Sequence, residues 1–163
     1  MPDSPSQGQD QLVIDAPSAT IWSIIEDSAR LPAWVPMVHT VDVPEGRREQ
    51  VGAVRTCDVR MLGRRGQITE RCTALDPGRR VSYAVDHETL GFARLTTGFG
   101  FSIDLRPVGA GTTAVTLTSN YRPRGLLGRL ANPLLSHQLR RSRRTMLARL
   151  KRLAEHSTVV RPR

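Results

Sequence analysis

Glu70 is the side chain of this sequence best placed to do acid–base chemistry. It stands between Ile68 and Cys72 in a segment where apolar and polar residues alternate, and a β-strand there would turn all three toward one apolar face. A carboxylate on such a face is costly unless it is paired with a cation or protonated. Glu70 would then be a general acid or base, or an anchor for a ligand hydroxyl. There are two alternatives. Glu70 forms a structural ion pair, or it lies at a strand edge and the alternation assigns it to the wrong face.

Arg143 is the expected partner of Glu70. It falls within the apolar stripe of a predicted C-terminal helix, between Leu139 and Leu150, so its guanidinium would face the same interior. The two side chains would form a buried pair, or Arg143 would hold an anionic group of a ligand.

Tyr83 and His87 complete the set of candidate catalytic residues, with Glu70. A tyrosine hydroxyl can orient a carbonyl or phenol, although such tyrosines more often line a wall with one hydrogen bond. A histidine can shuttle a proton near neutral pH, although a lone histidine is more often structural.

Other motifs that carry chemistry are absent from the sequence. There is no glycine-rich phosphate loop, no GxSxG, no HExxH and no CxxC, so the familiar nucleophile and nucleotide machinery is not indicated. Cys57 and Cys72 are too few for a disulfide scaffold and lack the paired spacing of a zinc site. We expect no metal, no cofactor and two buried, slowly reacting thiols.

The elements that would position these residues follow from hydrophobic periodicity. A short strand at Leu12–Ile14 precedes a helix that Ser18 would cap, and Pro32 and Pro36 bracket a second short helix. From Val38 to Tyr121 the pattern has period two with regular turn signals, which predicts an antiparallel meander. Its strands are expected at about 38–43, 52–62, 67–75, 80–87, 98–106 and 113–121.

Two turns set the expected register of the central strands. A tight turn centred on Gly63–Gly66 would pair residues whose numbers sum to 129, which places Cys57 opposite Cys72. A symmetric loop at Asp76–Arg79 would pair residues whose numbers sum to 155. Together with the terminal helix, the shared inner face supplies the expected ligand-binding residues: Val59, Met61, Glu70, Tyr83, Val85, Phe99, Phe101, Ile103, Leu117, Ser119, Tyr121, Leu135, Ser136, Leu139 and Arg143.

The C-terminal leucines form two stripes that one straight helix would not bury together. Asn132 is a good N-cap and Pro133 is tolerated at the first helical position, so we place the main helix at about 133–156. The leucine-rich segment 125–130 would be a flap, either mobile over a cavity mouth or packed on its own domain. The curved sheet must wrap around the helix to bury its inner face, which predicts an α+β fold with a seven-stranded antiparallel sheet gripping the helix.

Length and charge divide the chain. With 163 residues and 39% hydrophobic content, we expect one domain over 11–156, a disordered tail over 1–10 and a flexible basic end over 157–163. No apolar stretch could span a membrane and no secretory signal is present, so we expect a cytoplasmic protein.

The basic charge is concentrated at the C-terminal end. Residues 1–121 hold 12 basic and 14 acidic side chains, whereas residues 122–163 hold 12 and one. The run is either a solvated helix face or a surface for an anionic partner. In the second case we expect an anionic membrane rather than nucleic acid, because no nucleic-acid motif accompanies the run. The contacts would come from Arg122, Arg124, Arg140, Arg141 and Arg144.

Several short segments resemble one family. Ile14-Asp15-Ala16-Pro17, Ile21-Trp22 and Pro32-Ala33-Trp34-Val35-Pro36 are similar to the opening of the START-like, helix-grip superfamily called SRPBCC, especially its polyketide cyclase/dehydrase and lipid-transport branch. The segments 75–83, 111–116 and 121–123 are similar as well, so the resemblance covers about 11–156. It implies a hydrophobic cavity between sheet and terminal helix that binds lipids, polyketides or sterols. It does not imply catalysis, because the superfamily holds binders as well as cyclases and aromatases.

Three functions are therefore compared. The first is binding or carriage of a hydrophobic small molecule, which the interior face and the resemblance both favour. The second is a polyketide cyclase, aromatase or dehydratase acting in the same cavity. The third is an interaction protein that uses its basic helix on anionic membrane or nucleic acid. Only seven aromatic residues are present, which favours an aliphatic or mixed ligand, and binding rather than ring-forming catalysis.

Overall fold

The described part of the chain, residues 6–43 and 49–159 of a computed structural model, has seven antiparallel strands, four short helical segments and one long helix. The elements in order are β1 (Ser6–Ile14), α1 (Ser18–Ile25), η1 (Ser28–Arg30), α2 (Leu31–Trp34), β2 (Val38–Asp42), β3 (Val54–Met61), β4 (Arg64–Asp76), β5 (Arg80–Glu88), η2 (Phe92–Arg94), β6 (Thr96–Gly109), β7 (Thr112–Pro123) and α3 (Gly125–Val159).

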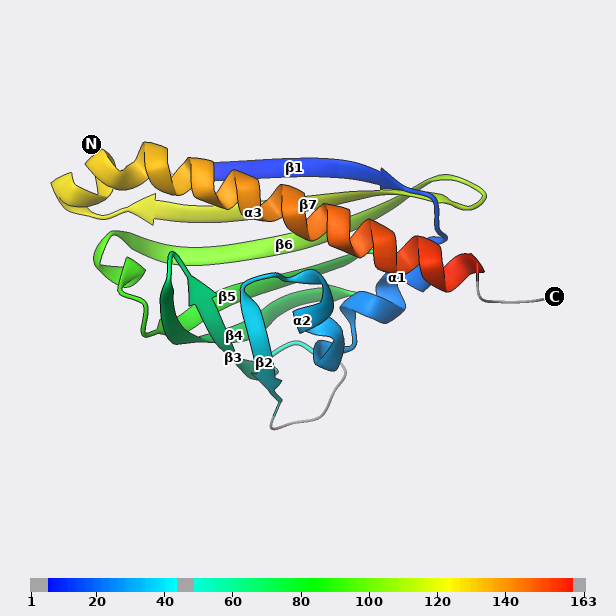
Figure 1. Cartoon of the computed structure of the whole chain (residues 1–163), viewed down its shortest axis with the longest axis horizontal. Coiled ribbons are helices and arrows are strands. Elements are labelled where there is room, and N and C mark those ends of the chain that lie inside the picture. The colour runs from blue at the N-terminus through cyan, green and yellow to red at the C-terminus, as the bar shows by residue number, and fades with distance from the viewer. Residues whose placement is uncertain (1–5, 44–48, 160–163) are drawn as a thin grey trace.

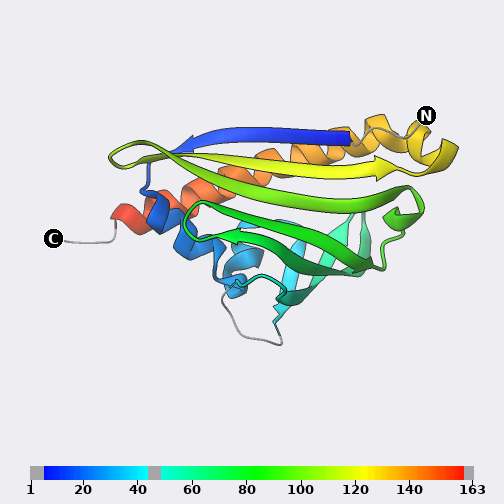
Figure 2. The same cartoon turned by 180° about the vertical axis from the view of Figure 1, so that it is seen from behind.

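One curved sheet and one long helix make the two layers. The strand order is β1-β7-β6-β5-β4-β3-β2, every neighbouring pair is antiparallel, and α3 lies across one face of the sheet (Figure 1). Seen from behind, the sheet stands in front of α3 (Figure 2). The predicted α+β helix-grip architecture, with two short helices after the first strand, is confirmed.

Residues 6–10 are part of the sheet, contrary to the disordered tail expected over 1–10. Ser6 pairs with Tyr121 and Asp10 with Leu117 in the β1–β7 ladder. Backbone hydrogen bonds and an ion pair from Asp10 to Arg143 order a segment that has no apolar side chains of its own. At the other end, α3 continues past the expected limit of 156 to Val159. Residues 1–5 and 160–163 lie outside the described residues.

The helix α3 is continuous, so the predicted break at Asn132 and the separate flap over 125–130 are both wrong. Pro133 lies inside the helix. The Asn132 side chain does not cap a new helix, because its Oδ1 accepts hydrogen bonds from the hydroxyl groups of Tyr121, at 2.6 Å, and Ser6, at 3.3 Å. The expected cap at Ser18 is also wrong, since Ser18 is the first residue of α1 and Pro17 precedes it.

The β3–β4 register differs from the prediction by four residues. Paired residue numbers sum to 125, so Cys57 lies opposite Ile68 and Glu70 opposite Arg55. The turn is the two-residue loop Leu62-Gly63, in which both residues have positive φ, 51° and 76°, the conformation that joins twisted strands most tightly. An even shift keeps each side chain on its predicted face, and both thiols are buried, but Cys57 and Cys72 are not cross-strand neighbours.

The β4–β5 register agrees with the prediction in the middle and departs at its ends. Glu70 pairs with Val85 and Cys72 with Tyr83, as a sum of 155 requires, but irregularities on both sides shift the pairing by one residue. The irregularity between Thr69 and Glu70 leaves Thr69 paired with His87. His87 is therefore exposed, and its predicted place on the inner face is wrong.

Candidate functional site

The inner face of the sheet is sealed beneath the C-terminal half of α3. Leu147, Leu150 and Ala154 of the helix are at most 2% exposed, and they belong to the same core as Ile14 and Val115, which are fully buried. The isoleucines of α1 close this end further, since Ile21, Ile24 and Ile25 are at most 2% exposed. No ligand could enter here without unfolding the core.

Beneath the N-terminal half of α3, six of the expected ligand-binding side chains are only partly buried. This partly buried set comprises Met61, Val85, Phe99, Phe101, Leu135 and Leu139. We call this half of the interior the accessible end, because these apolar side chains are partly exposed.

The aromatic side chains of strands β5, β6 and β7 gather at this accessible end. Phe101 stacks on Tyr83 with 4.9 Å between ring centroids. Phe99 stacks on Tyr121 at 5.9 Å and contacts Phe92 at 5.6 Å. All three phenylalanines and both tyrosines of the chain thus lie in two neighbouring groups. The low aromatic content therefore does not argue against an aromatic wall.

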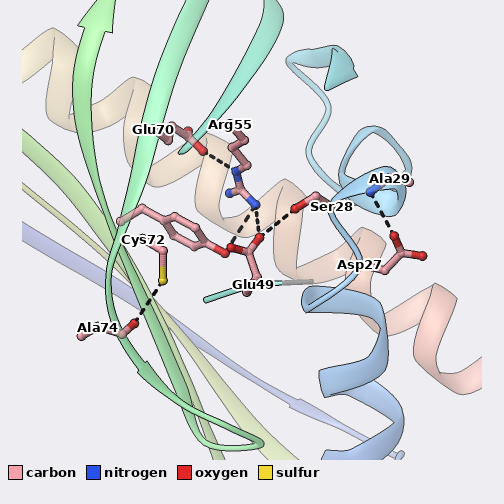
Figure 3. Close-up of polar contacts among 9 residues, drawn as sticks. Asp27, Ser28, Ala29, Glu49, Arg55, Glu70, Cys72 and Ala74 are labelled. Carbon is pink, nitrogen blue, oxygen red and sulfur yellow. Dashed lines mark hydrogen bonds and ion pairs between the residues drawn. The ribbon is translucent and has the colours of Figure 1, made fainter. Parts of the chain in front are cut away.

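A buried ion cluster centred on Arg55 lies beside Tyr83, and Figure 3 shows its contacts with Glu70 and Glu49. Arg55, 4% exposed, donates from Nε to Glu70 at 2.8 Å and from Nη1 to Glu49 at 2.7 Å. Its guanidinium lies over the Tyr83 ring, 4.1 Å from the centroid, and Nη1 also approaches the Tyr83 hydroxyl at 3.4 Å. Ser28 donates to Glu49 at 2.8 Å. The cluster carries two carboxylates for one guanidinium.

Burial and charge shift the pKa values within this cluster. Burial by itself would lower the pKa of Arg55. The charges of Glu70, Tyr83 and Glu49 together raise the pKa by more than burial lowers it, so the guanidinium stays charged. Burial raises the pKa of Tyr83 well above its usual value, so its hydroxyl stays protonated and can donate a hydrogen bond. Burial, with Glu70 next, raises the pKa of Cys57 to about 12. The thiol of Cys57 and the hydroxyl of Tyr83 are therefore both protonated at neutral pH.

Glu70 and Arg143 do not meet. Arg143, 8% exposed, donates from Nε to Asp10 at 2.8 Å and from Nη1 to Ser119 at 2.6 Å. Both predicted interior charges are buried as expected, but each has a nearer partner. The Arg143 cluster therefore joins α3 to β1 and β7.

The other predicted ligand contacts separate into two kinds. Val59, Ile103 and Leu117 are at most 3% exposed, so they lie in the core behind the accessible surface. Tyr121 is also buried, and its hydroxyl is held by Asn132 at 2.6 Å and Ser136 at 2.9 Å. The Ser136 hydroxyl is therefore hydrogen-bonded to Tyr121.

A groove opens between α3 and the end of β3. Its volume is about 220 Å³, and it is lined on one side by Met37, Arg60, Met61 and Leu62 and on the other by residues of α3 that include Gln138, Arg141 and Ser142. Ligand pockets are typically about 300–1,000 Å³, so this groove is smaller than a usual ligand pocket. No group of three or more His, Cys, Asp or Glu side chains within 6–43 and 49–159 is arranged to hold a metal ion.

A family model described as polyketide cyclase / dehydrase and lipid transport matches residues 8–155. The chain belongs to this family. The match spans all seven strands and most of α3, so the predicted resemblance is confirmed. No curated protein matches the chain in sequence.

Solved structures similar to this family member include enzymes as well as START proteins. The Zhui aromatase/cyclase from Streptomyces sp. R1128 is 20% identical with a TM-score of 0.80, covering 95% of this chain and 96% of that one. A START superfamily protein from Mycobacterium smegmatis is 15% identical (TM-score 0.73, 92% and 97% covered). A norcoclaurine synthase from Thalictrum flavum, in complex with a transition state analogue, is 14% identical (TM-score 0.75, 97% and 99% covered). At these identities the likeness establishes the fold.

Sequence reasoning missed three members of the central cluster: Arg55, Glu49 and Ser28. Arg55 shares the alternation of Cys57 and Val59, so its inward facing could have been found. Its pairing with Glu70 depends on the register, which the turn prediction placed four residues away. Glu49 follows residues 44–48, which lie outside the described ranges, and no periodic pattern marks it.

Proposed function

We propose that this protein binds or carries a hydrophobic small molecule, such as a lipid or polyketide, between the sheet and the N-terminal half of α3. The observation that carries the proposal is the contrast along the helix, where a sealed core gives way to partly buried apolar and aromatic side chains. Membership of a family described by polyketide and lipid chemistry supports it. As the sequence predicts, we place the activity in the cytoplasm.

The ligand would have an apolar body and at least one polar group. Phe99, Phe101 and Val85 offer the apolar surface, while Glu70 and the Arg55 guanidinium lie on the adjoining strands. A ligand hydroxyl or carbonyl directed toward this cluster would gain charge-assisted hydrogen bonds in a site of low dielectric.

Titration with an apolar fluorescent probe tests the proposal. N-phenyl-1-naphthylamine should bind with a stoichiometry near one and be displaced by long-chain fatty acids. Phe101→Trp adds volume at the accessible wall and should weaken probe binding at least tenfold with little loss of stability. Val13→Trp, at an exposed position of β1, is the matched control and should bind like the parent protein. A failure of saturable binding, or equal effects of the two variants, would contradict the proposal.

A second candidate is catalysis of cyclisation or dehydration on the same ligand. The observation that favours it is the buried pair of Glu70 with Arg55 beside the protonated Tyr83 hydroxyl, since a carboxylate and a hydroxyl donor are the groups that aldol and dehydration steps need. Incubation with a short poly-β-ketone, followed by product analysis, distinguishes it from binding alone. Product formation that is lost in Glu70→Gln, with probe binding intact, would establish catalysis.

A further inference from the structure

The first turns of α3 expose their leucines to solvent. Leu126, Leu127, Leu130 and Leu134 are between 70% and 73% exposed. Their spacing of one, four and eight residues places them on one side of the helix, within an arc of about 100°. We call these four residues the leucine face.

The opposite side of the same turns is small or polar and faces the protein. Gly128 packs so closely on Leu95 that a Cβ at that position would collide with its carbonyl oxygen. One turn later, Asn132 binds the hydroxyl of Tyr121, and Ser136 does so one turn after that. This is the reverse of an ordinary amphipathic surface helix, which buries its apolar side.

The orientation of the leucine face is fixed by contacts of the chain before it. Gly125 has a positive φ of 62°, and the Arg124 backbone N–H donates to the Leu95 carbonyl at 2.7 Å. Rotating the leucines inward would break these contacts together with those of Tyr121. Figures 1 and 2 both place these turns at the end of the molecule where β7 ends.

The surroundings of the leucine face carry charge of one sign. Residues 122–142 contain five arginines and no acidic residue. Arg122, Arg124, Arg140 and Arg141 are exposed, and Arg141 follows Leu134 by seven residues, which puts it on the same side of α3 two turns later. Leucines at a helix end flanked by arginines match the layering of a bilayer surface, with hydrocarbon below anionic headgroups.

We propose that the leucine face docks on an anionic lipid bilayer, where Leu126, Leu127, Leu130 and Leu134 enter the interface and Arg122, Arg124, Arg140 and Arg141 contact the headgroups. Within the described residues, no helix is long and apolar enough to cross a membrane, so the contact is peripheral. Because the accessible inner wall lies under the same half of α3, docking would bring the ligand site to the bilayer; this last step rests on the proposed function, whereas docking itself does not.

Two other occupants fit the surface less well. A second copy of the chain, placed by a twofold axis, would set Arg122, Arg124 and Arg141 close to their own equivalents, which costs energy. A nucleic acid would use the arginines but would leave four exposed leucines without partners, since phosphate contacts are polar. Anionic lipid uses both features.

Vesicle co-sedimentation tests the docking surface directly. The full chain should bind vesicles of phosphatidylcholine with 30% phosphatidylglycerol, and binding should fall at least tenfold in pure phosphatidylcholine or when salt rises from 0.05 to 0.5 M. Leu127→Ser with Leu134→Ser should reduce the partition coefficient at least tenfold. A second double variant, Arg122→Gln with Arg141→Gln, should reduce the partition coefficient about fivefold for each arginine removed.

Matched controls use exposed side chains away from the leucine face. Val51→Ser replaces a residue that is 63% exposed, and Arg106→Gln replaces an exposed arginine of β6; both should bind vesicles like the parent protein, and circular dichroism should confirm that every variant is folded. The proposal is overturned by an absence of binding to anionic vesicles at low salt, by equal binding of the leucine variant, or by a dimer that only the leucine variant abolishes. A protein that binds the fluorescent probe but no vesicles would disprove docking alone.

Discussion

At the scale of single residues, Arg55 is the centre of the site because it neutralises two buried carboxylates at once. Its Nε and Nη1 atoms reach Glu70 and Glu49 within 2.8 Å, and its guanidinium covers Tyr83. A planar guanidinium can do all three at once, whereas an ammonium group cannot. Removing it would leave two carboxylates without a counter-ion in a site of low dielectric.

Arg55→Met is therefore expected to lower the free energy of unfolding by about 3–5 kcal/mol, the usual cost of breaking a buried ion pair from one side. Urea denaturation monitored by circular dichroism measures it. The control is Arg80→Gln, which breaks the exposed pair with Asp104 and should cost less than about 1 kcal/mol. Similar losses in both variants would mean that the Arg55 cluster is no more important than a surface pair.

The thiol of Cys57 gives a pH-dependence at the same scale. Its pKa is raised by burial to about 12, so the native protein keeps the proton while the unfolded chain releases it near pH 9. Stability from this thiol is complete below pH 9 and is lost as pH rises from about 9 to about 12. Unfolding followed in urea at pH 8, 10 and 11 should show this decline, with a shallower slope in Cys57→Ala. Reaction with a disulfide reagent at pH 8 should be slow until urea unfolds the protein; rapid reaction would contradict burial.

At the scale of elements, strands were predictable because alternation identifies the buried face without knowledge of the partner strand. Ile68, Glu70 and Cys72 all face inward as their spacing indicates. The pairing of β3 with β4 was not predictable in the same way. Leucine at positive φ is unfavourable and gives no turn signal in the sequence, so the two-residue loop Leu62-Gly63 was concealed, and with it the contact between Arg55 and Glu70.

The bulge in β5 and the continuity of α3 were hidden for similar reasons. An extra residue in a strand turns His87 outward, and nothing in a single sequence marks such a bulge. Asn132-Pro133 is typical of a helix start, but here the Asn132 side chain binds the Tyr121 hydroxyl and α3 continues through Pro133. Both features depend on neighbours distant in the chain.

The contact between α3 and β1 makes a prediction at this scale. Asp10 is the carboxylate partner of Arg143, and both side chains are nearly buried. Asp10→Asn leaves the Arg143 guanidinium without its counter-ion. The free energy of unfolding should therefore be about 3 kcal/mol lower than in the parent protein. Amide hydrogen exchange in residues 6–10 should rise as well. Asp104→Asn serves as the control at an exposed pair, and unchanged exchange in β1 would show that the backbone ladder alone holds this strand.

At the scale of the whole molecule, the protein divides along α3 into a sealed end and an accessible end. The sealed end holds the fully buried side chains Ile14, Ile21 and Leu150, which can be exposed only by global unfolding. The accessible end carries the partly buried Phe99 and Phe101, and a separate groove lies beside Met61. A division of this kind separates the part that stabilises the fold from the part in which we propose that the ligand binds.

Hydrogen exchange should resolve the two ends in the absence of ligand. Amides of α1 and of residues 147–154 are expected to exchange with the free energy of global unfolding. Amides of residues 60–66 and 92–99 should open at lower free energy, because fewer apolar contacts cover them. Saturation with N-phenyl-1-naphthylamine should slow amide exchange more at the accessible end than at the sealed end. Equal protection along the whole chain would argue that the interior is one closed core with no room for a ligand, since a site that admits a small molecule must open more readily than the core that supports it.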